Sequence, residues 1–134
     1  MKYYYGAELY GRRGKSGKLR DAIIDGDTID VLCDCGFGVR LAMRLRLAGI
    51  DTPESRTRNK EEKALGLASK AFLREALESA ASIEFLSHER GKYGRVLATV
   101  YAIDDDGNRR NINAALVEAG HARRYDGGKR EPWT

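Results

Sequence analysis

The sequence predicts an α+β, mainly β fold: a small β-barrel of the OB type with one helix inserted midway and a short second helix. Two patterns support this prediction. Apolar and polar residues alternate from residue 39 to residue 48, which is typical of a half-buried strand. The core-facing side of that strand would carry Leu41, Met43, Leu45 and Leu47. Apolar residues then recur at helical spacing over residues 60–79, between two groups of short strands.

Four strands are expected before that helix. They cover residues 3–10, 19–24, 28–34 and 39–48. The turn Asp25-Gly26-Asp27 joins the second strand to the third, and Gly36-Phe37-Gly38 joins the third to the fourth.

The helix over residues 60–79 has its own start signal and apolar stripe. Asn59 is the expected N-cap, with Glu62 three residues later. The stripe consists of Leu65, Ala68, Phe72 and Ala76. Beyond it we expect strands over 82–87 and 96–103, a short helix around 112–119 that ends at Gly120, and extended chain over 121–126.

The composition favours a globular protein with polyanionic partners. The 134 residues carry a formal net charge of +4, and a basic surface attracts polyanions such as nucleic acids. No apolar run approaches the roughly 20 residues of a membrane span, and no secretory signal is visible. We therefore expect a cytoplasmic monomer without membrane contact, although a secreted form after removal of a leader stays open. The two cysteines, Cys33 and Cys35, are expected to be reduced thiols.

Oxygen donors occur at the ends of two neighbouring strands. Asp27 begins the third strand, and Asp51 follows the fourth, which should pair with it as a hairpin. Together with Thr52 they form an oxygen-only set, which selects a hard cation, calcium or magnesium. The competing interpretation is that each aspartate only caps its own turn.

Three further side chains could act on a phosphate ester. Glu54 lies close enough to Asp51 to share its site and could activate a water molecule as general base. Arg46 and Arg95 could clamp phosphate oxygens, since a guanidinium matches them bidentately. Alone, each could equally be a solvated surface residue.

Taken together, the motifs are more specific. Asp25-Gly-Asp-Thr28, Arg46 with Asp51-Thr-Pro-Glu54, and Lys92-Tyr-Gly-Arg95 occur in this order, with a helix between the second and the third. In this respect the chain resembles the staphylococcal nuclease (thermonuclease) family, from about Leu19 to Tyr125.

The resemblance implies a five-stranded Greek-key OB-type barrel and a calcium-dependent endonuclease that hydrolyses DNA and RNA to 3′-phosphate ends. The family's metal ligands fall on Asp27, Asp51 and Thr52, and its catalytic residues fall on Arg46, Glu54 and Arg95. Its substrate-binding residues fall on Lys92, Tyr93 and Tyr125. The family needs no organic cofactor, only Ca²⁺.

The chain departs from the family at both ends. Residues 1–134 are expected to form one nuclease-like domain, with 1–17 as an N-terminal extension and 127–134 as a tail, both outside the core. The tail takes the place of the family's third helix.

Two other functions compete with the nuclease. A noncatalytic OB-fold module that binds nucleic acid or a protein partner is the main alternative. A metal-dependent phosphatase for small substrates is weaker, because the flanks of the chain are basic.

Overall fold

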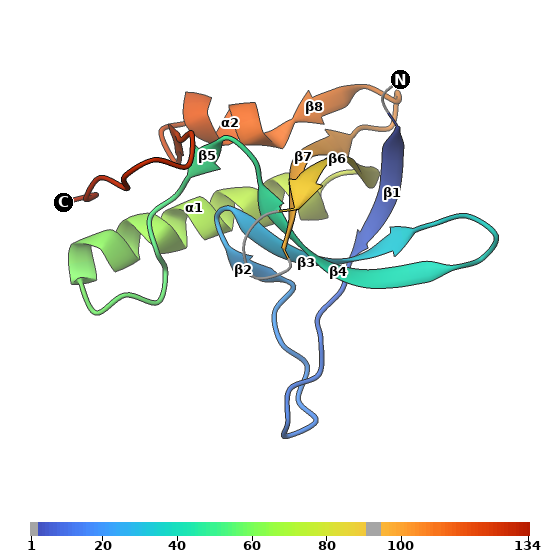
Figure 1. The fold of residues 1–134 in the computed structure, drawn as a ribbon, viewed down its shortest axis with the longest axis horizontal. Coiled ribbons are helices and arrows are strands. Elements are labelled where there is room, and N and C mark those ends of the chain that lie inside the picture. Colours follow the sequence, from blue (N-terminus) through green and yellow to red (C-terminus); the bar gives the residue numbers. More distant parts are fainter. Residues whose placement is uncertain (1–2, 91–94) are drawn as a thin grey trace.

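The computed structural model describes residues 3–90 and 95–134 and shows a curved sheet with a long helix packed across it (Figure 1). The strands, in chain order, are β1 (Tyr4–Leu9), β2 (Ile23–Asp25), β3 (Thr28–Asp34), β4 (Arg40–Leu47), β5 (Ile50–Asp51), β6 (Ser82–Arg90), β7 (Val96–Ile103), β8 (Arg109–Asn111) and β9 (Arg123–Arg124). The helices are α1 (Lys60–Glu78), between β5 and β6, and α2 (Ile112–Glu118), between β8 and β9.

Five of these strands close into a ring. The hydrogen-bonded order is β1-β6-β7-β4-β3, and β1 also pairs with β3, which completes the circle. All of these pairs are antiparallel except β4 with β7, which run parallel with Leu45 opposite Val96. A closed five-stranded ring with a helix inserted after β5 confirms the predicted OB-type barrel.

The predicted N-terminal boundary of the core was wrong. Residues 1–17 were expected to lie outside the core, but β1 is a member of the ring. Its register places Ala7 opposite both Cys33 and Ile83, and Tyr5 and Leu9 pack against the buried cluster. The first strand therefore closes the barrel, because without it β6 and the Val31–Cys33 part of β3 would be open edges.

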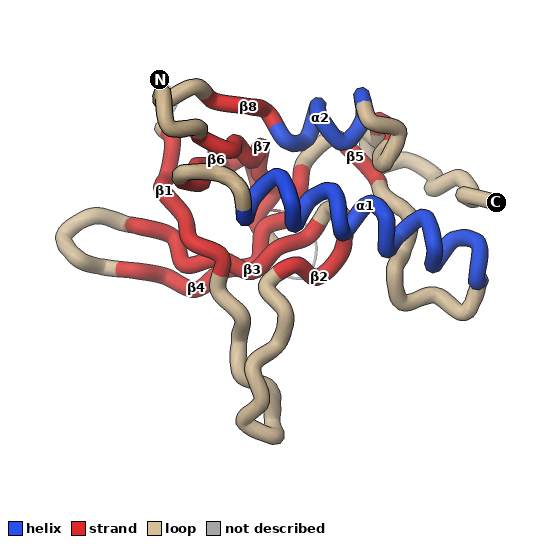
Figure 2. The backbone as a smooth tube through the Cα atoms, turned by 180° about the vertical axis from the view of Figure 1, so that it is seen from behind, coloured by secondary structure: helices blue, strands red, loops and turns tan. Residues whose placement is uncertain are grey.

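The interior of the ring is filled by aliphatic side chains and one phenylalanine. Its fully buried members include Ile23, Ile29, Val31, Leu45, Leu47, Phe85, Val100, Ile112 and Leu116. Leu41 is an exception to the predicted face, being 54% exposed. The β3–β4 hairpin runs beyond the body of the barrel at this end (Figures 1 and 2), so the alternation there continues without a core to bury it.

Helix α1 presents a face rotated from the predicted one. Asn59 caps it as expected and accepts hydrogen bonds from the backbone N–H groups of Glu61 and Glu62. Leu65 and Ala68, however, are exposed. The buried residues are Gly66, Ser69, Leu73, Ala76 and Leu77. A glycine and a serine belong to this face because it packs against backbone.

The contact at Gly66 is the closest of these. A Cβ atom at this position would lie 2.5 Å from the carbonyl carbon and oxygen of Glu54 and 2.6 Å from the nitrogen of Ser55. Helix α1 therefore lies directly on the loop that carries Glu54, and only glycine allows that distance.

Helix α2 is joined to the sheet by one buried amide. Asn113 accepts a hydrogen bond from the N–H of Val100 at 3.0 Å. It donates to the carbonyl oxygens of Ala48 at 2.9 Å and Ala98 at 3.1 Å. This amide links β7 to the turn that follows β4, so it fixes the start of the segment that leads to Asp51.

Both cysteines are free thiols, with Cys33 buried in the core and Cys35 exposed. Burial, with Cys35 nearby, raises the pKa of Cys33 to about 11. Within the described residues, no helix has the length and apolar character needed to cross a membrane.

Replacing Gly66 by Ala should destabilise the protein although alanine favours helices. The new methyl group would meet the Glu54–Ser55 backbone, and overpacking of this kind costs about 1–3 kcal/mol. Urea unfolding should show this loss, whereas Leu67→Ala, on the exposed side of α1, should have a much smaller effect. Equal stability of Gly66→Ala and the parent would contradict the close contact.

Candidate active site

One rim of the barrel carries two buried aspartates. Asp27 is 8% exposed and Asp51 2% exposed; Asp27 lies in the turn before β3, and Asp51 is the second residue of β5, after the turn that follows β4. Arg46, opposite Thr28 in the β3–β4 register, places its guanidinium Nη1 3.2 Å from Asp27. The Asp27 carboxylate also accepts hydrogen bonds from the hydroxyl of Thr28 and the N–H of Thr52. Asp27 is thus fully hydrogen-bonded at the rim, as a buried carboxylate must be.

The turn that contains Asp27 is wedged between two other elements. A Cβ atom on Gly26 would lie 2.7 Å from that of Ser69 on α1 and 3.2 Å from that of Thr52. The Asp-Gly-Asp motif therefore depends on the absence of a side chain at its centre, and the close contact places Asp27 beside Thr52.

Asp51 is bound by two arginines of the C-terminal segment. The β5–β9 pair sets Asp51 opposite Arg123, whose Nη2 lies 3.4 Å from Asp51 Oδ2. Arg130 Nε donates to the same oxygen at 3.0 Å. Figure 1 shows the C-terminal tail beside β5.

Arg130 joins three of the predicted site residues. Besides Asp51, its guanidinium donates to Oε1 of Glu54 at 2.9 Å and to the carbonyl oxygen of Thr52 at 3.0 Å. Burial acts to lower the pKa of Arg130, but the hydrogen bonds to Glu54 and Asp51 outweigh it, so its pKa is raised. No motif in the sequence indicates this role for Arg130; the one related signal is the basic character of the flanks of the chain.

The oxygen set fits a hard cation in its chemistry. Asp51, Thr52 and Glu54 direct oxygens at one positive group, the guanidinium, and Thr52 Oγ1 is buried without a hydrogen-bond partner. In the part of the chain that the structure describes, no three His, Cys, Asp or Glu side chains form a metal-binding group. These oxygens are therefore suited to binding a cation. In this structure the guanidinium of Arg130 supplies the positive charge that they contact.

The backbone of Glu54 and its neighbour is held by hydrogen bonds to two acidic side chains. The N–H of Glu54 donates to the side chain of Glu62 in the first turn of α1 at 3.0 Å. The next residue, Ser55, donates its N–H at 3.1 Å and its hydroxyl at 2.5 Å to Asp25. These contacts hold the loop while the Glu54 side chain extends into solvent towards Arg130.

The predicted phosphate arginines share a cavity with the predicted substrate tyrosine. This cavity, of about 430 Å³, is lined by Arg46, Arg95 and Tyr125, together with residues 47–50, Leu97, Asp126 and Gly127. Arg46 also donates to the carbonyl oxygens of Leu47 and Ile50, so its guanidinium lies between the cavity and Asp27. Lys92 and Tyr93 lie outside the described residues.

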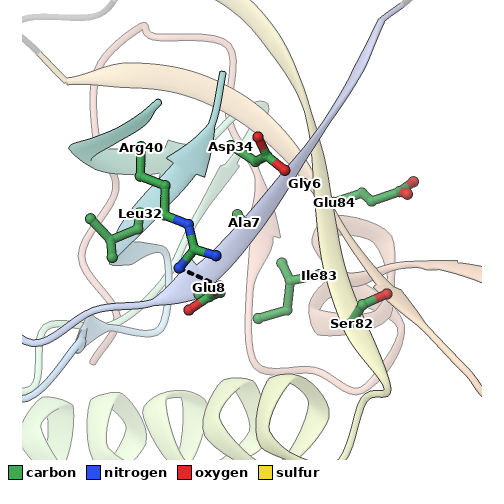
Figure 3. Close-up of a pocket in the computed structure, with 9 residues that line it drawn as sticks. All are labelled: Gly6, Ala7, Glu8, Leu32, Asp34, Arg40, Ser82, Ile83 and Glu84. Atoms are coloured by element: carbon green, nitrogen blue, oxygen red, sulfur yellow. Dashed lines mark ion pairs between the residues drawn. The ribbon is translucent and has the colours of Figure 1, made fainter. Parts of the chain in front are cut away.

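Another cavity, of about 260 Å³, lies between β1, β6 and the β3–β4 hairpin (Figure 3). Its charged residues include Glu8 and Arg40, which form an exposed ion pair at 3.1 Å, and Asp34 and Glu84 at its edge. None of the predicted site residues in the described part of the chain lines it.

A sequence model described as "Staphylococcal nuclease homologue" matches residues 44–132, from β4 through the tail. The chain belongs to the staphylococcal nuclease family. The matched range includes the rim from Arg46 to Glu54, the parallel strand after Arg95, and Arg130.

Similarity to curated proteins is consistent with this family membership. The chain is 38% identical over 107 residues to "Protein ParB" of Escherichia coli, which covers 77% of this chain and 54% of the relative. It is 37% identical over 107 residues to "Micrococcal nuclease" of Shigella flexneri, covering 77% and 55%. An "Uncharacterized endonuclease" of Escherichia coli is 32% identical over 110 residues, covering 82% and 61%. The chain thus spans a little more than half the length of these relatives.

Replacing Asp25 by Ala should loosen the loop that carries Glu54. The change removes both hydrogen bonds from Ser55 to a carboxylate, and unsatisfied partners of this kind cost about 1–3 kcal/mol. Urea unfolding of Asp25→Ala should show that loss, whereas Asp106→Ala, exposed in the acidic turn after β7, should stay near the parent. If the two variants were equally stable, Asp25 would not hold this loop.

Proposed function

We propose that this chain is a nuclease that hydrolyses internal phosphodiester bonds of DNA and RNA and leaves 3′-phosphate ends. The observation that carries the proposal is the position of Arg46. It lines the cavity that contains Arg95 and Tyr125, and it also pairs with Asp27 at the carboxylate rim. A phosphate bound to Arg46 in this cavity would therefore lie beside the carboxylate rim, where a water molecule could be activated to attack it. Family membership and the nuclease names of the relatives in Shigella flexneri and Escherichia coli support this function.

The cofactor we propose is a calcium ion held by Asp27, Asp51 and Thr52. Calcium prefers carboxylate and carbonyl oxygens, and the unpaired Thr52 Oγ1 adds a donor at the same rim. When bound, the ion would polarise a phosphoryl oxygen as a Lewis acid.

The chain's own residues supply the remaining chemistry. Among Asp27, Asp51 and Glu54, the side chain of Glu54 is the most exposed, at 51%, so it can reach a water molecule and take its proton. Arg46 and Arg95 offer guanidinium groups to the nonbridging oxygens, on which negative charge grows as water adds to phosphorus. Tyr125, whose hydroxyl donates to the carbonyl of Gly128 at 2.7 Å, is held at the cavity wall as a surface for a base.

The alternative is a noncatalytic OB-fold module that binds nucleic acid. One observation favours it: Arg130 already satisfies Asp51, Thr52 and Glu54 without a metal ion. A domain that only bound nucleic acid would lose nothing by keeping that arrangement.

Replacing Glu54 by Gln should reduce the rate of DNA hydrolysis by several orders of magnitude, because the amide cannot accept the proton of water. Nucleotide binding should persist, since Arg46 and Arg95 are unchanged. Both can be measured with labelled single-stranded DNA. Glu61→Gln, on the exposed first turn of α1, is the matched control and should keep the parent rate.

The same assay separates the two functions. The parent protein should release acid-soluble nucleotides in calcium and none after chelation. Binding without release at any calcium concentration would establish the noncatalytic module, and a parent rate in Glu54→Gln would remove Glu54 as the base.

A further inference from the structure

A basic hairpin projects from the barrel between β1 and β2, and we call residues 11–20 the basic arm. Its two sides are joined by backbone hydrogen bonds. The N–H of Gly14 donates to the carbonyl oxygen of Lys18 at 2.9 Å, and that of Arg20 to the carbonyl oxygen of Arg12 at 2.8 Å. Arg13 and Leu19 form an antiparallel β-bridge between the two sides. Figures 1 and 2 show the arm extending away from the sheet and from both helices. It is therefore an ordered ladder that packs against little of the core.

The arm carries one sign of charge. It contains Arg12, Arg13, Lys15, Lys18 and Arg20 and no acidic residue, and all five cations are exposed. Of these, Arg12 comes within 3.8 Å of Asp30, which is bound more closely by Arg44 at 2.8 Å. The arm's positive charge is thus largely uncompensated, and the fold gains no core packing from the five side chains.

A cavity lies at the base of the arm, where Arg20 lines it. This cavity, of about 440 Å³, is lined by Arg20, Asp21, Ile24, Arg44 and Arg56. Its acidic member, Asp21, is already paired with Arg74 and Lys70. Arg56 follows Glu54 by two residues, so the arginines of the cavity continue from the loop of the proposed general base to the arm.

We propose that the basic arm and this arginine cavity bind the phosphodiester backbone of a nucleic acid beyond the nucleotides held at Arg46 and Arg95. The inference rests on the proposed function, and it specifies a long polynucleotide as the preferred substrate. Contacts of this kind are independent of sequence and weaken steeply with salt.

Binding experiments on the Glu54→Gln protein test the arm without cleavage. Lys15→Gln/Lys18→Gln should bind a fluorescent 20-nucleotide DNA at least tenfold more weakly at low salt. The slope of log affinity against log salt should fall by about 1.4, that is about 0.7 for each lost contact. Affinity for a dinucleotide should be unchanged. Arg40→Gln/Arg110→Gln, which removes the same charge from exposed positions on β4 and β8, should change the affinity less than twofold.

Equal losses in the two double variants would overturn the proposal, because net charge alone would explain them. A parallel loss of dinucleotide affinity would also overturn it, since the lysines would then belong to the nucleotide cavity. If length-dependent binding were confirmed but the parent protein cut no DNA, the arm would stand and the nuclease would fail.

The C-terminal tail places one arginine against the candidate site. Arg130 Nε, Nη1 and Nη2 each donate to one oxygen of Asp51, Glu54 or Thr52. Nearby, the Arg123 guanidinium stacks over the Trp133 ring at 4.1 Å and donates to the carbonyl oxygens of Glu131 and Pro132. The tail is thus also fastened on the C-terminal side of Arg130.

The guanidinium and a calcium ion would require the same oxygens. Asp51 Oδ2 and the Thr52 carbonyl already have donors at 3.0 Å, which is the distance of a direct hydrogen bond. A cation bound to these atoms must displace Arg130, and Glu54 then loses its partner at 2.9 Å. Loading the metal would therefore release the carboxylate needed as base.

We infer that residues 127–134 form an autoinhibitory tail in which Arg130 occupies the cation position until calcium expels it. This inference also rests on the proposed function. It makes calcium affinity a balance between the ion and an arginine of the same chain, and this balance can be measured without any substrate.

Calorimetry and fluorescence test the tail directly. Arg130→Gln should bind calcium at least fivefold more tightly than the parent, while Lys129→Gln, which removes the adjacent charge, should differ less than twofold. Trp133 is the only tryptophan, so its emission reports the tail. Calcium should shift the emission of the parent to that of calcium-free Arg130→Gln.

Equal calcium affinities of the parent and Arg130→Gln, or undetectable binding in both, would overturn the tail inference. So would emission from Trp133 that calcium leaves unchanged while the ion binds. Displacement of the tail by calcium in a protein that cuts no nucleic acid would leave the inference intact and reject the nuclease instead.

Discussion

Two carboxylates buried at one rim of a small barrel need positive charge close by, and much of the rim is arranged around that need. An isolated carboxylate in a low-dielectric site is costly to ionise, so each one must be paired. Asp27 is paired with Arg46 from the neighbouring strand, and Asp51 with Arg123 and Arg130 from the far end of the chain. The same pairing explains why β5 and β9, each only two residues long, are joined at all: their contact brings the cations to Asp51.

The scaffold beneath the rim depends on close backbone contact rather than on large side chains. Helix α1 approaches the Asp25–Asp27 turn and the Glu54 loop at Ser69 and Gly66. The hydroxyl of Ser69 also donates to the carbonyl of His121 at 2.7 Å, which links α1 to the segment before β9. One helix thereby fixes three separate pieces of chain that meet at the rim, and the site inherits the rigidity of the helix.

Local pattern predicted the elements well, and long-range pairing explains what it missed. The alternation before Leu47 and the Asn59 cap are local signals, and both strand and helix formed where expected. Leu41 follows the alternating pattern but is exposed, because the β3–β4 hairpin extends beyond the core at this residue. Periodicity alone does not indicate where along a strand the core ends. The ordered motifs identified Asp27, Asp51 and Glu54 as candidates. Nothing in the spacing of Arg130 indicated its role, because its partners lie more than seventy residues earlier in the chain.

The five-stranded ring can close only late in synthesis. Strand β1 is made before the other strands, yet one of its two partners, β6, lies far downstream, with Tyr4 opposite Leu86. A hairpin of β3 and β4 can form early from neighbouring residues, and β1 can add to it through Ala7 and Cys33. The ring itself closes only after α1, β6 and β7 have left the ribosome, because β7 joins β6 to β4 and contacts distant in sequence form late. Until then the outer edge of β1 is an unprotected strand on a nascent chain.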